Sequence, residues 1–275
     1  MKRDRKENKA FTGDARKIGE VSAMYDLLPE TLRFIEKNEL VTPAYSEDGT
    51  YRIYGQGNMV ELYEYLAYRN MGFAVKDIQA MKAGAGAAWL AGELQGRQRA
   101  LESEAHYKAL LAEQIRMQAK KLSFTACNEG LIWRETLPAG RFACFVVGGA
   151  DKPFYSLNAI AWRKQAPFTQ LAILHDDARP GIEAINWGLY AEARLLEALN
   201  LPQDDTMETI AERQCLCAVV RVPLAQNPYD AVTPLRDYAK AHGITLVGSA
   251  LFIHLRLEKE RDGQYQVFQA YAPLK

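Results

Sequence analysis

The sequence predicts an α+β chain in three parts. These are an N-terminal winged helix-turn-helix, one long helix, and a C-terminal domain in which a β-α-β-β pattern occurs twice. Three observations predict this fold class. Short amphipathic segments with turn signals occupy residues 16–83, proline is absent from 84–124, and residues 125–275 change to the two-residue period of strands. A length of 275 residues allows this many parts, since a domain commonly takes about 100–200 residues.

Composition is that of an ordinary globular protein, with 48% hydrophobic and 25% charged residues. No apolar run approaches the roughly 18 residues of a membrane helix, and Met1–Lys9 is charged with no apolar stretch behind it. We therefore expect a cytoplasmic protein. The net charge is zero, and residues 10–82 are net −3. Any surface for nucleic acid must therefore gather its few cations on one side.

The four cysteines are Cys127, Cys144, Cys215 and Cys217. None forms a Cys-x-x-Cys pair, and no histidine stands beside them at metal spacing. We expect no metal and no cofactor, and we interpret the cysteines as buried free thiols, with a redox role as the alternative.

Two short helices open the chain after a charged arm, which we expect to be flexible over residues 1–15. Lys17–Asp26 has apolar residues at helical spacing, and Pro29 is well placed in the first turn of a second helix, Pro29–Asn38. Two short helices joined by about three residues are typical of a helix-turn-helix.

A wing and two further helices complete the predicted domain. Two extended stretches within Val41–Tyr54 flank Asp48-Gly49, a strong hairpin signal. Met59–Asn70 and Val75–Lys82 are predicted helices, separated by a break at Gly72.

A long helix is predicted from about Ala87 to Leu122, after a hinge at Gly84 and Gly86. Apolar residues recur every seven positions, with an interruption at Lys108, and face small ones, which is typical of a coiled-coil seam. The seam predicts a homodimer; the alternative is a helix packed on its own domain. The residues that we expect at the dimer contact are Leu94, Leu101, Ala105, Ala112, Ile115 and Leu122.

Strand-like segments then follow in the order strand, helix, strand, strand, twice over. An α+β domain of two related halves is therefore expected over residues 125–275. The first set comprises Leu131–Leu137, Phe142–Val147, the helix Ser156–Arg163, Gln170–His175 and Ile185–Tyr190. The second set comprises Arg213–Val222, the helix Tyr229–His242, Ile244–Gly248, Leu251–Leu257 and Tyr265–Tyr271.

The N-terminal segments resemble the MerR family of regulators. The resemblance is carried by Ile18–Glu20, by Thr31–Glu36 on the second helix, by Gly49–Tyr54 in the wing and by Met71–Phe73 at the helix break. It implies a regulator that binds a near-palindromic promoter as an antiparallel dimer. It further implies that the regulator acts with RNA polymerase by distorting an overlong promoter spacer.

DNA contacts are expected from the second helix, the wing and the following helix. Arginine forks onto phosphate or guanine, which favours Arg33 and Arg52. Phe34 has a core position as its alternative, and Tyr54 could equally pack under the wing. The expected set is Thr31, Arg33, Phe34, Lys37, Arg52, Tyr54 and Arg69.

The C-terminal half resembles the gyrase-inhibitor-like effector-binding domain. The resemblance is carried by Ala211–Arg221, Leu235–His242 and Gln266–Lys275. In that family a glutamate on the last strand meets cationic ligands, and Gln269 stands at its place here. We therefore expect a neutral or weakly charged aromatic or amphipathic ligand, unless Glu183 supplies a carboxylate. The expected ligand contacts are Phe145, Trp162, Glu183, Trp187, Gln269 and Tyr271.

Two other functions stay open. The densest group of possible catalytic side chains is His175-Asp176-Asp177, which borders a turn and is better interpreted as a solvated loop, so we expect no enzyme activity. A ligand-independent DNA-binding protein is the other alternative, although a second domain rich in aromatics argues against it.

Overall fold

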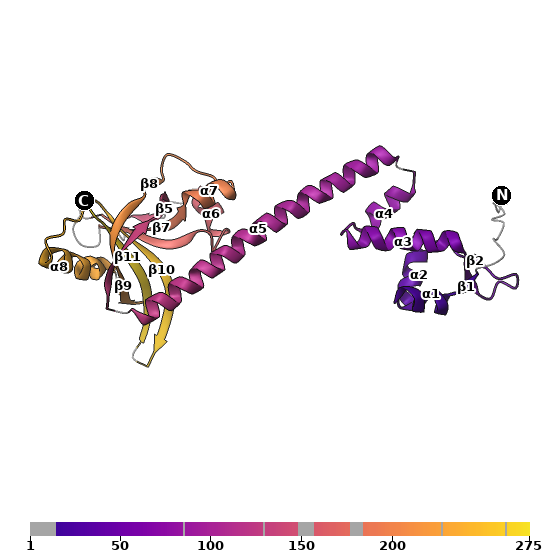
Figure 1. Cartoon of the computed structure of the whole chain (residues 1–275), viewed down its shortest axis with the longest axis horizontal. Helices are drawn as coiled ribbons and strands as arrows, with labels where there is room; N and C mark the ends of the chain where they lie inside the picture. The colour runs from indigo at the N-terminus through magenta and orange to yellow at the C-terminus, as the bar shows by residue number, and fades with distance from the viewer. Residues whose placement is uncertain are drawn as a thin grey trace. The chain divides into compact units, whose positions relative to one another are not determined.

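The computed structural model describes residues 15–84, 86–128, 130–147, 157–176, 184–226, 228–261 and 263–275. The chain divides into two compact units, Met1–Glu104 and Ala105–Lys275, and the boundary falls within one helix. Figure 1 shows the elements of both units. The arm expected over residues 1–15 lies, apart from residue 15, outside the described residues.

Four helices form most of the N-terminal unit: α1 Ile18–Tyr25, α2 Pro29–Lys37, α3 Gln56–Asn70 and α4 Val75–Lys82. The first two are the expected helix-turn-helix. Asp26 ends α1 in the left-handed conformation at φ 51°, and Pro29 occupies the first turn of α2. Helix α3 begins before its predicted start at Met59, because the Asn58 side chain accepts the Gly55 backbone N–H at 3.0 Å and caps an earlier turn.

The wing is the expected hairpin with one strand more. Strands β2 (Ala44–Tyr45) and β3 (Arg52–Tyr54) are antiparallel, and Gly49 takes the positive φ of 72° that their turn requires. Strand β1 (Arg16–Lys17) adds to the other edge of β3. Its two residues have too little pattern to predict it from the sequence.

Helix α5 spans Ala87–Cys127, five residues beyond its predicted end. In the N-terminal unit its Leu94 packs against the core that Leu32, Ile35 and Leu62 help to form. Arg97 donates from Nε to the backbone oxygen of Met71 at 2.6 Å. The beginning of α5 is thereby attached to the turn between α3 and α4.

The C-terminal unit is built on one eight-stranded antiparallel sheet with the order β4-β9-β11-β10-β6-β7-β5-β8. The two predicted halves are present as β5-α6-β6-β7 and β9-α8-β10-β11, and they join edge to edge where β6 pairs with β10. The strands are β4 Ile132–Leu137, β5 Gly140–Val147, β6 Gln170–His175, β7 Ile185–Glu192, β8 Glu208–Ile210, β9 Arg213–Pro223, β10 Ala250–Glu260 and β11 Gly263–Pro273.

Each face of this sheet is covered by helices. The helices α6 (Leu157–Arg163) and α8 (Thr233–Ala241) pack on one face, where Trp162, Leu235 and Phe268 are buried. Residues 105–127 of α5 contact the other face, which buries Cys217, Leu251 and Tyr271. Side chains alternate along each strand, so neighbouring residues of one strand belong to opposite faces.

One expected strand is absent from the described residues, and two short elements are present that the sequence did not predict. Ile244–Gly248 is not a strand, because it makes a single bridge, from Leu246 to Leu274, between two glycines of positive φ. Helix α7 (Ala193–Ala198) and strand β8 were not predicted, since both are too short to show a period.

The cysteines are unpaired; Cys215 and Cys217 are buried as expected, whereas Cys144 is half-buried and Cys127 is exposed. Burial raises the pKa of the Cys215 thiol to about 11 and also raises that of Cys217, so neither is a ready thiolate. Across the described ranges, no three His, Cys, Asp or Glu side chains gather to hold a metal ion. No helix among the same residues has both the length and the apolar character to span a membrane.

Candidate functional site: the outer surface of helix α2 and a cavity against helix α5

Helix α2 presents two cations on its outer surface. Leu32 and Ile35 are buried in the core, which turns Arg33, Phe34 and Lys37 outward. Arg33 and Lys37 are one helical turn apart and share a face. Phe34 is 48% exposed, so the alternative of a core position does not apply to it. Thr31, in the first turn of the helix, is half-buried.

A cluster of Glu36, Arg52 and Tyr54, here called the Glu36 cluster, joins α2 to the wing. Arg52 donates from Nε to one carboxylate oxygen of Glu36 at 2.6 Å, and the Tyr54 hydroxyl donates to the other. The hydrogen bond to Glu36 raises the pKa of Arg52. Both oxygens of the carboxylate are therefore used, and the wing arginine is held beside the second helix.

Tyr54 corrects one expected DNA contact. Its side chain is fully buried in the N-terminal core and its hydroxyl is bonded to Glu36, so the alternative of packing under the wing is the right one. Burial raises its pKa, which keeps the hydroxyl protonated. Arg69 is exposed, and it donates from Nη1 to the Phe73 backbone oxygen at 2.7 Å.

The seven-residue stripe of α5 divides between two roles. Leu94 is half-buried against the N-terminal core, as the alternative of packing on its own domain expects. Leu101, Ala105, Ala112 and Ile115 are exposed, Ile115 by 56%. Leu122 is half-buried. An apolar strip therefore remains uncovered on the middle of α5 in the single chain.

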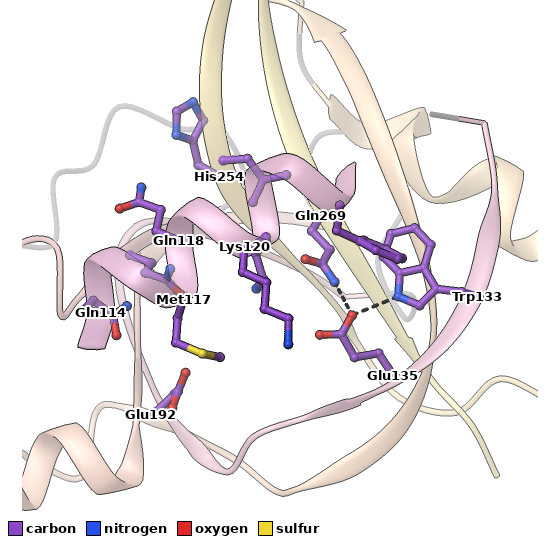
Figure 2. A pocket seen from close by; sticks show the side chains of 13 residues that line it. Gln114, Met117, Gln118, Lys120, Trp133, Glu135, Glu192, His254 and Gln269 are labelled. Carbon is purple, nitrogen blue, oxygen red and sulfur yellow. Dashed lines mark hydrogen bonds between the residues drawn. The ribbon is translucent and has the colours of Figure 1, made fainter. Parts of the chain in front are cut away.

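A cavity of about 350 Å³ lies between the last turns of α5 and the sheet. That volume is in the range of small-molecule sites, commonly about 300–1,000 Å³. Figure 2 shows its side chains, which come from α5 and from strands of both halves of the sheet. The lining includes Met117, Lys120, Lys121, Phe124, Trp133, Glu135, Glu192 and Gln269.

The wall formed by β4 and β11 holds a carboxylate. Glu135 accepts from Trp133 Nε1 at 2.9 Å and from Gln269 Nε2 at 2.7 Å, both at Oε2 (Figure 2). Gln269 is 1% exposed, and its Oε1 has no hydrogen-bond partner among the described residues. We call Glu135, Trp133, Gln269 and Lys121 the Glu135 cluster.

Lys121 reaches the same wall from α5. Its Nζ donates to the Tyr271 hydroxyl at 2.9 Å and lies 5.5 Å from the centroid of that ring. Desolvation lowers the pKa of Lys121, against the opposing effect of the Glu135 and Glu192 carboxylates. Burial raises the pKa of Tyr271 well above its ordinary value, so the partner of the ammonium is a neutral hydroxyl.

The expected ligand residues are separated by the sheet. Gln269 lines the cavity, and Tyr271 holds the lysine that lines it. Phe145, Trp162 and Trp187 pack on the opposite face; Trp162 is fully buried and donates to the Pro202 backbone oxygen at 2.9 Å. These three are therefore away from Gln269. Glu183 lies outside the described residues.

Two functional candidates were missed from the sequence. The sequence pattern could have indicated Glu135. It lies two residues after Trp133 on a predicted strand and therefore on the same face, and a carboxylate on an inward face is uncommon. No such pattern indicated Lys121, because it lies off the seven-residue stripe of α5. The cavity also lies under α5 rather than in a cleft between the two halves, since β6 and β10 close that junction.

Comparison with known proteins identifies the N-terminal part. Residues 16–84 match the family model described as MerR HTH family regulatory protein. No curated protein matches the chain. Among solved structures, the EcmrR–DNA complex is 13% identical at a TM-score of 0.38, over 94% of this chain and 99% of that one.

Two further solved structures cover single parts. A MerR-family transcriptional regulator from Bacillus cereus is 21% identical, covering 40% of this chain and 83% of that one at a TM-score of 0.35. A hydrolase from Listeria innocua is 13% identical, covering 57% of this chain and 98% of that one at a TM-score of 0.35. At TM-scores under 0.5, none of these likenesses decides what this chain does.

The helix-turn-helix, the wing and the family model agree on the same residues. Residues 16–84 therefore form a winged helix-turn-helix domain that matches the MerR HTH family model.

Proposed function

We propose that the protein is a ligand-responsive regulator that binds promoter DNA as a homodimer through α5. Its effector would be a small aromatic or amphipathic compound, bound in the cavity against the same helix. One observation carries the proposal: residues 114–124 of α5 form a wall of the cavity. A molecule in that cavity must therefore contact the helix that leads to the DNA-binding domain.

The contacts of α5 support a route for the signal. In the C-terminal unit, Lys121 bonds Tyr271 and Phe124 stacks edge-on against Trp133 at 5.1 Å. In the N-terminal unit, Leu94 and Arg97 hold the beginning of the helix. A ligand that repositions the end of this helix would bias what is attached to its beginning, provided that it binds one arrangement better than the other.

The action on DNA follows the family resemblance. Each α2 would enter a major groove, and the active form would distort an overlong promoter spacer so that RNA polymerase can engage both of its elements. Bending a site of this size costs on the order of 1–6 kcal/mol. A ligand with a modest difference in affinity for the two forms suffices to tip such a balance.

DNA binding is tested with the full chain on sites selected from a random-sequence pool. Arg52→Ala should weaken binding to all sequences and reduce the slope of log affinity against log salt by about 1, because one phosphate contact is lost. Lys259→Ala, on β10, is the matched control. Wild-type affinity and salt slope in Arg52→Ala would remove Arg52 from the interface.

Dimer formation is tested by sedimentation. Leu101→Asp with Ile115→Asp should give monomers that do not bind the selected site, because charges replace the exposed apolar strip. Ser103→Asp, off the stripe, should leave the dimer intact. A dimer that survives both stripe substitutions would contradict the proposal.

Recovery of a bound effector unchanged after incubation separates a sensor from an enzyme.

A further inference from the structure

The cavity holds a buried acceptor without a donor. The Glu135 carboxylate fixes the Gln269 amide, because only the NH₂ group can donate to it, at 2.7 Å. Oε1 must then point the other way, and it has no partner within the described part of the chain although Gln269 is 1% exposed. A buried acceptor left without a donor costs about 1–3 kcal/mol, so an occupant that brings a donor is favoured.

The cavity also holds a cation whose partner carries no charge. The ammonium of Lys121 bonds the Tyr271 hydroxyl at 2.9 Å, and its pKa is lowered by desolvation. Removing a charge from water without an opposite charge in contact is unfavourable. An occupant that brings an anionic oxygen to Nζ would supply the missing partner.

The space near these two groups is apolar and aromatic. Phe124 and Trp133 meet edge to face with ring centroids 5.1 Å apart, and Met117 lines the same cavity. Aromatic faces and a flexible thioether suit a flat ring. The charged side chains of the lining are Lys120, Lys121, Glu135 and Glu192, which balance.

We propose that the cavity binds a dipolar aromatic compound, with a ring against Phe124 and Trp133. A positively polarised N–H donor would meet Gln269 Oε1 beside Glu135, and a carboxylate would meet Lys121. This inference rests on the proposed function and names the ligand class of its cavity. An amine without an acid leaves the buried Lys121 charge unmatched and adds a like charge. An acid without an amine leaves Oε1 unmatched and stands near Glu135 and Glu192.

Three probes with one ring and one chain length test this proposal by calorimetry on the full-length protein. They are 2-naphthylalanine, 2-(2-naphthyl)ethylamine and 3-(2-naphthyl)propionate. The amino acid should bind at least about tenfold more tightly than either single-charge probe, because it alone makes both charge-assisted contacts. An amine or acid that binds as tightly as the amino acid, or no binding by all three, would overturn the proposal.

Two variants assign the contacts. Lys121→Met keeps the length of the side chain and should abolish the preference for the amino acid over the amine, and Lys121→Arg should restore part of it. Gln269→Leu should abolish the preference over the acid. The matched controls, Lys259→Met and Gln264→Leu on the distal β10–β11 hairpin, should keep both preferences. Unchanged preferences in Lys121→Met or Gln269→Leu would contradict the assigned roles, once tryptophan fluorescence has shown that the variant is folded.

Failure here can be told from failure of the proposed function. A promoter response to a purely cationic compound that fills the cavity would overturn the dipolar class and leave the ligand-responsive regulator standing. A cavity that no compound of any charge type enters, with DNA binding intact, would overturn both the ligand class and ligand sensing.

Discussion

The Glu36 cluster of the N-terminal unit and the Glu135 cluster of the C-terminal unit use similar parts in opposite ways. Each has a carboxylate that accepts from an aromatic side chain, Tyr54 in one and Trp133 in the other. In the Glu36 cluster the arginine lies against the carboxylate, and both carboxylate oxygens accept. In the Glu135 cluster the lysine bonds a hydroxyl instead, and the amide oxygen of Gln269 is without a described partner.

The difference separates a structural cluster from a binding site. A closed network stabilises one arrangement, here the wing on α2, and leaves neither oxygen of its carboxylate free for a ligand. An open network costs stability while the cavity is empty, and such costs are typical of sites that bind something. Substitutions should therefore destabilise at the first cluster and be neutral or stabilising at the second.

Glu36→Ala should have the largest effect, lowering the local free energy of unfolding of residues 16–84 by about 2–3 kcal/mol. Most of the loss comes from the Tyr54 hydroxyl, which is left buried without its acceptor, because Arg52 is 36% exposed and can turn to water. Hydrogen exchange of these residues measures it, with Glu47→Ala in the wing turn as control. An effect within the error of the control would mean that the closed network is not structural.

Lys121→Met should act in the other direction and stabilise the ligand-free protein by about 1 kcal/mol, because removing a poorly compensated buried charge outweighs the loss of its hydrogen bond to the Tyr271 hydroxyl. Urea unfolding followed by tryptophan fluorescence reports it, since Trp133, Trp162 and Trp187 belong to this unit. Clear destabilisation would show that Lys121 is a structural tie like Arg52.

The stabilisation by Lys121→Met should shrink as the pH rises. Because the pKa of Lys121 is lowered in the folded protein, the folded state releases this proton before the unfolded state does. The free energy of unfolding of the wild type then rises between the pH equal to the lowered pKa and the pH equal to the ordinary lysine pKa. Over that pH interval the difference in this free energy between the variant and the wild type narrows. The titratable groups that face Lys121 are Glu135, Glu192, Cys217 and Tyr271, and of these the two carboxylates carry charge in this interval. A gap that widens over the same interval would contradict the sign of this shift.

Gln269→Leu should have the smallest effect on the empty protein, within about 0.5 kcal/mol of wild type. The substitution takes one donor from Glu135, which keeps Trp133, and also removes the acceptor that has no donor. The two changes offset each other. Urea unfolding alongside Gln264→Leu measures the difference, and a loss of the size expected for Glu36→Ala would erase the contrast between the clusters.

The sequence by itself determined the local features of this protein. Pro29 marked the beginning of α2, Gly72 marked the break between α3 and α4, and the seven-residue stripe predicted the long helix α5. The two-residue period put Gln269 and Tyr271 on one face of β11. These features depend on residues a few positions away in the sequence, so they do not require tertiary contacts.

Tertiary structure alone decided which side chains meet. Glu135 reaches Gln269 because β4 and β11 pair with the two edges of β9. The register of β7 places Trp187 on the face of the sheet opposite to Gln269. Tyr54 turned inward because Glu36 receives its hydroxyl. Pairing and register join residues far apart in the chain, and a shift of one residue exchanges the faces of a strand, so no local pattern contains them.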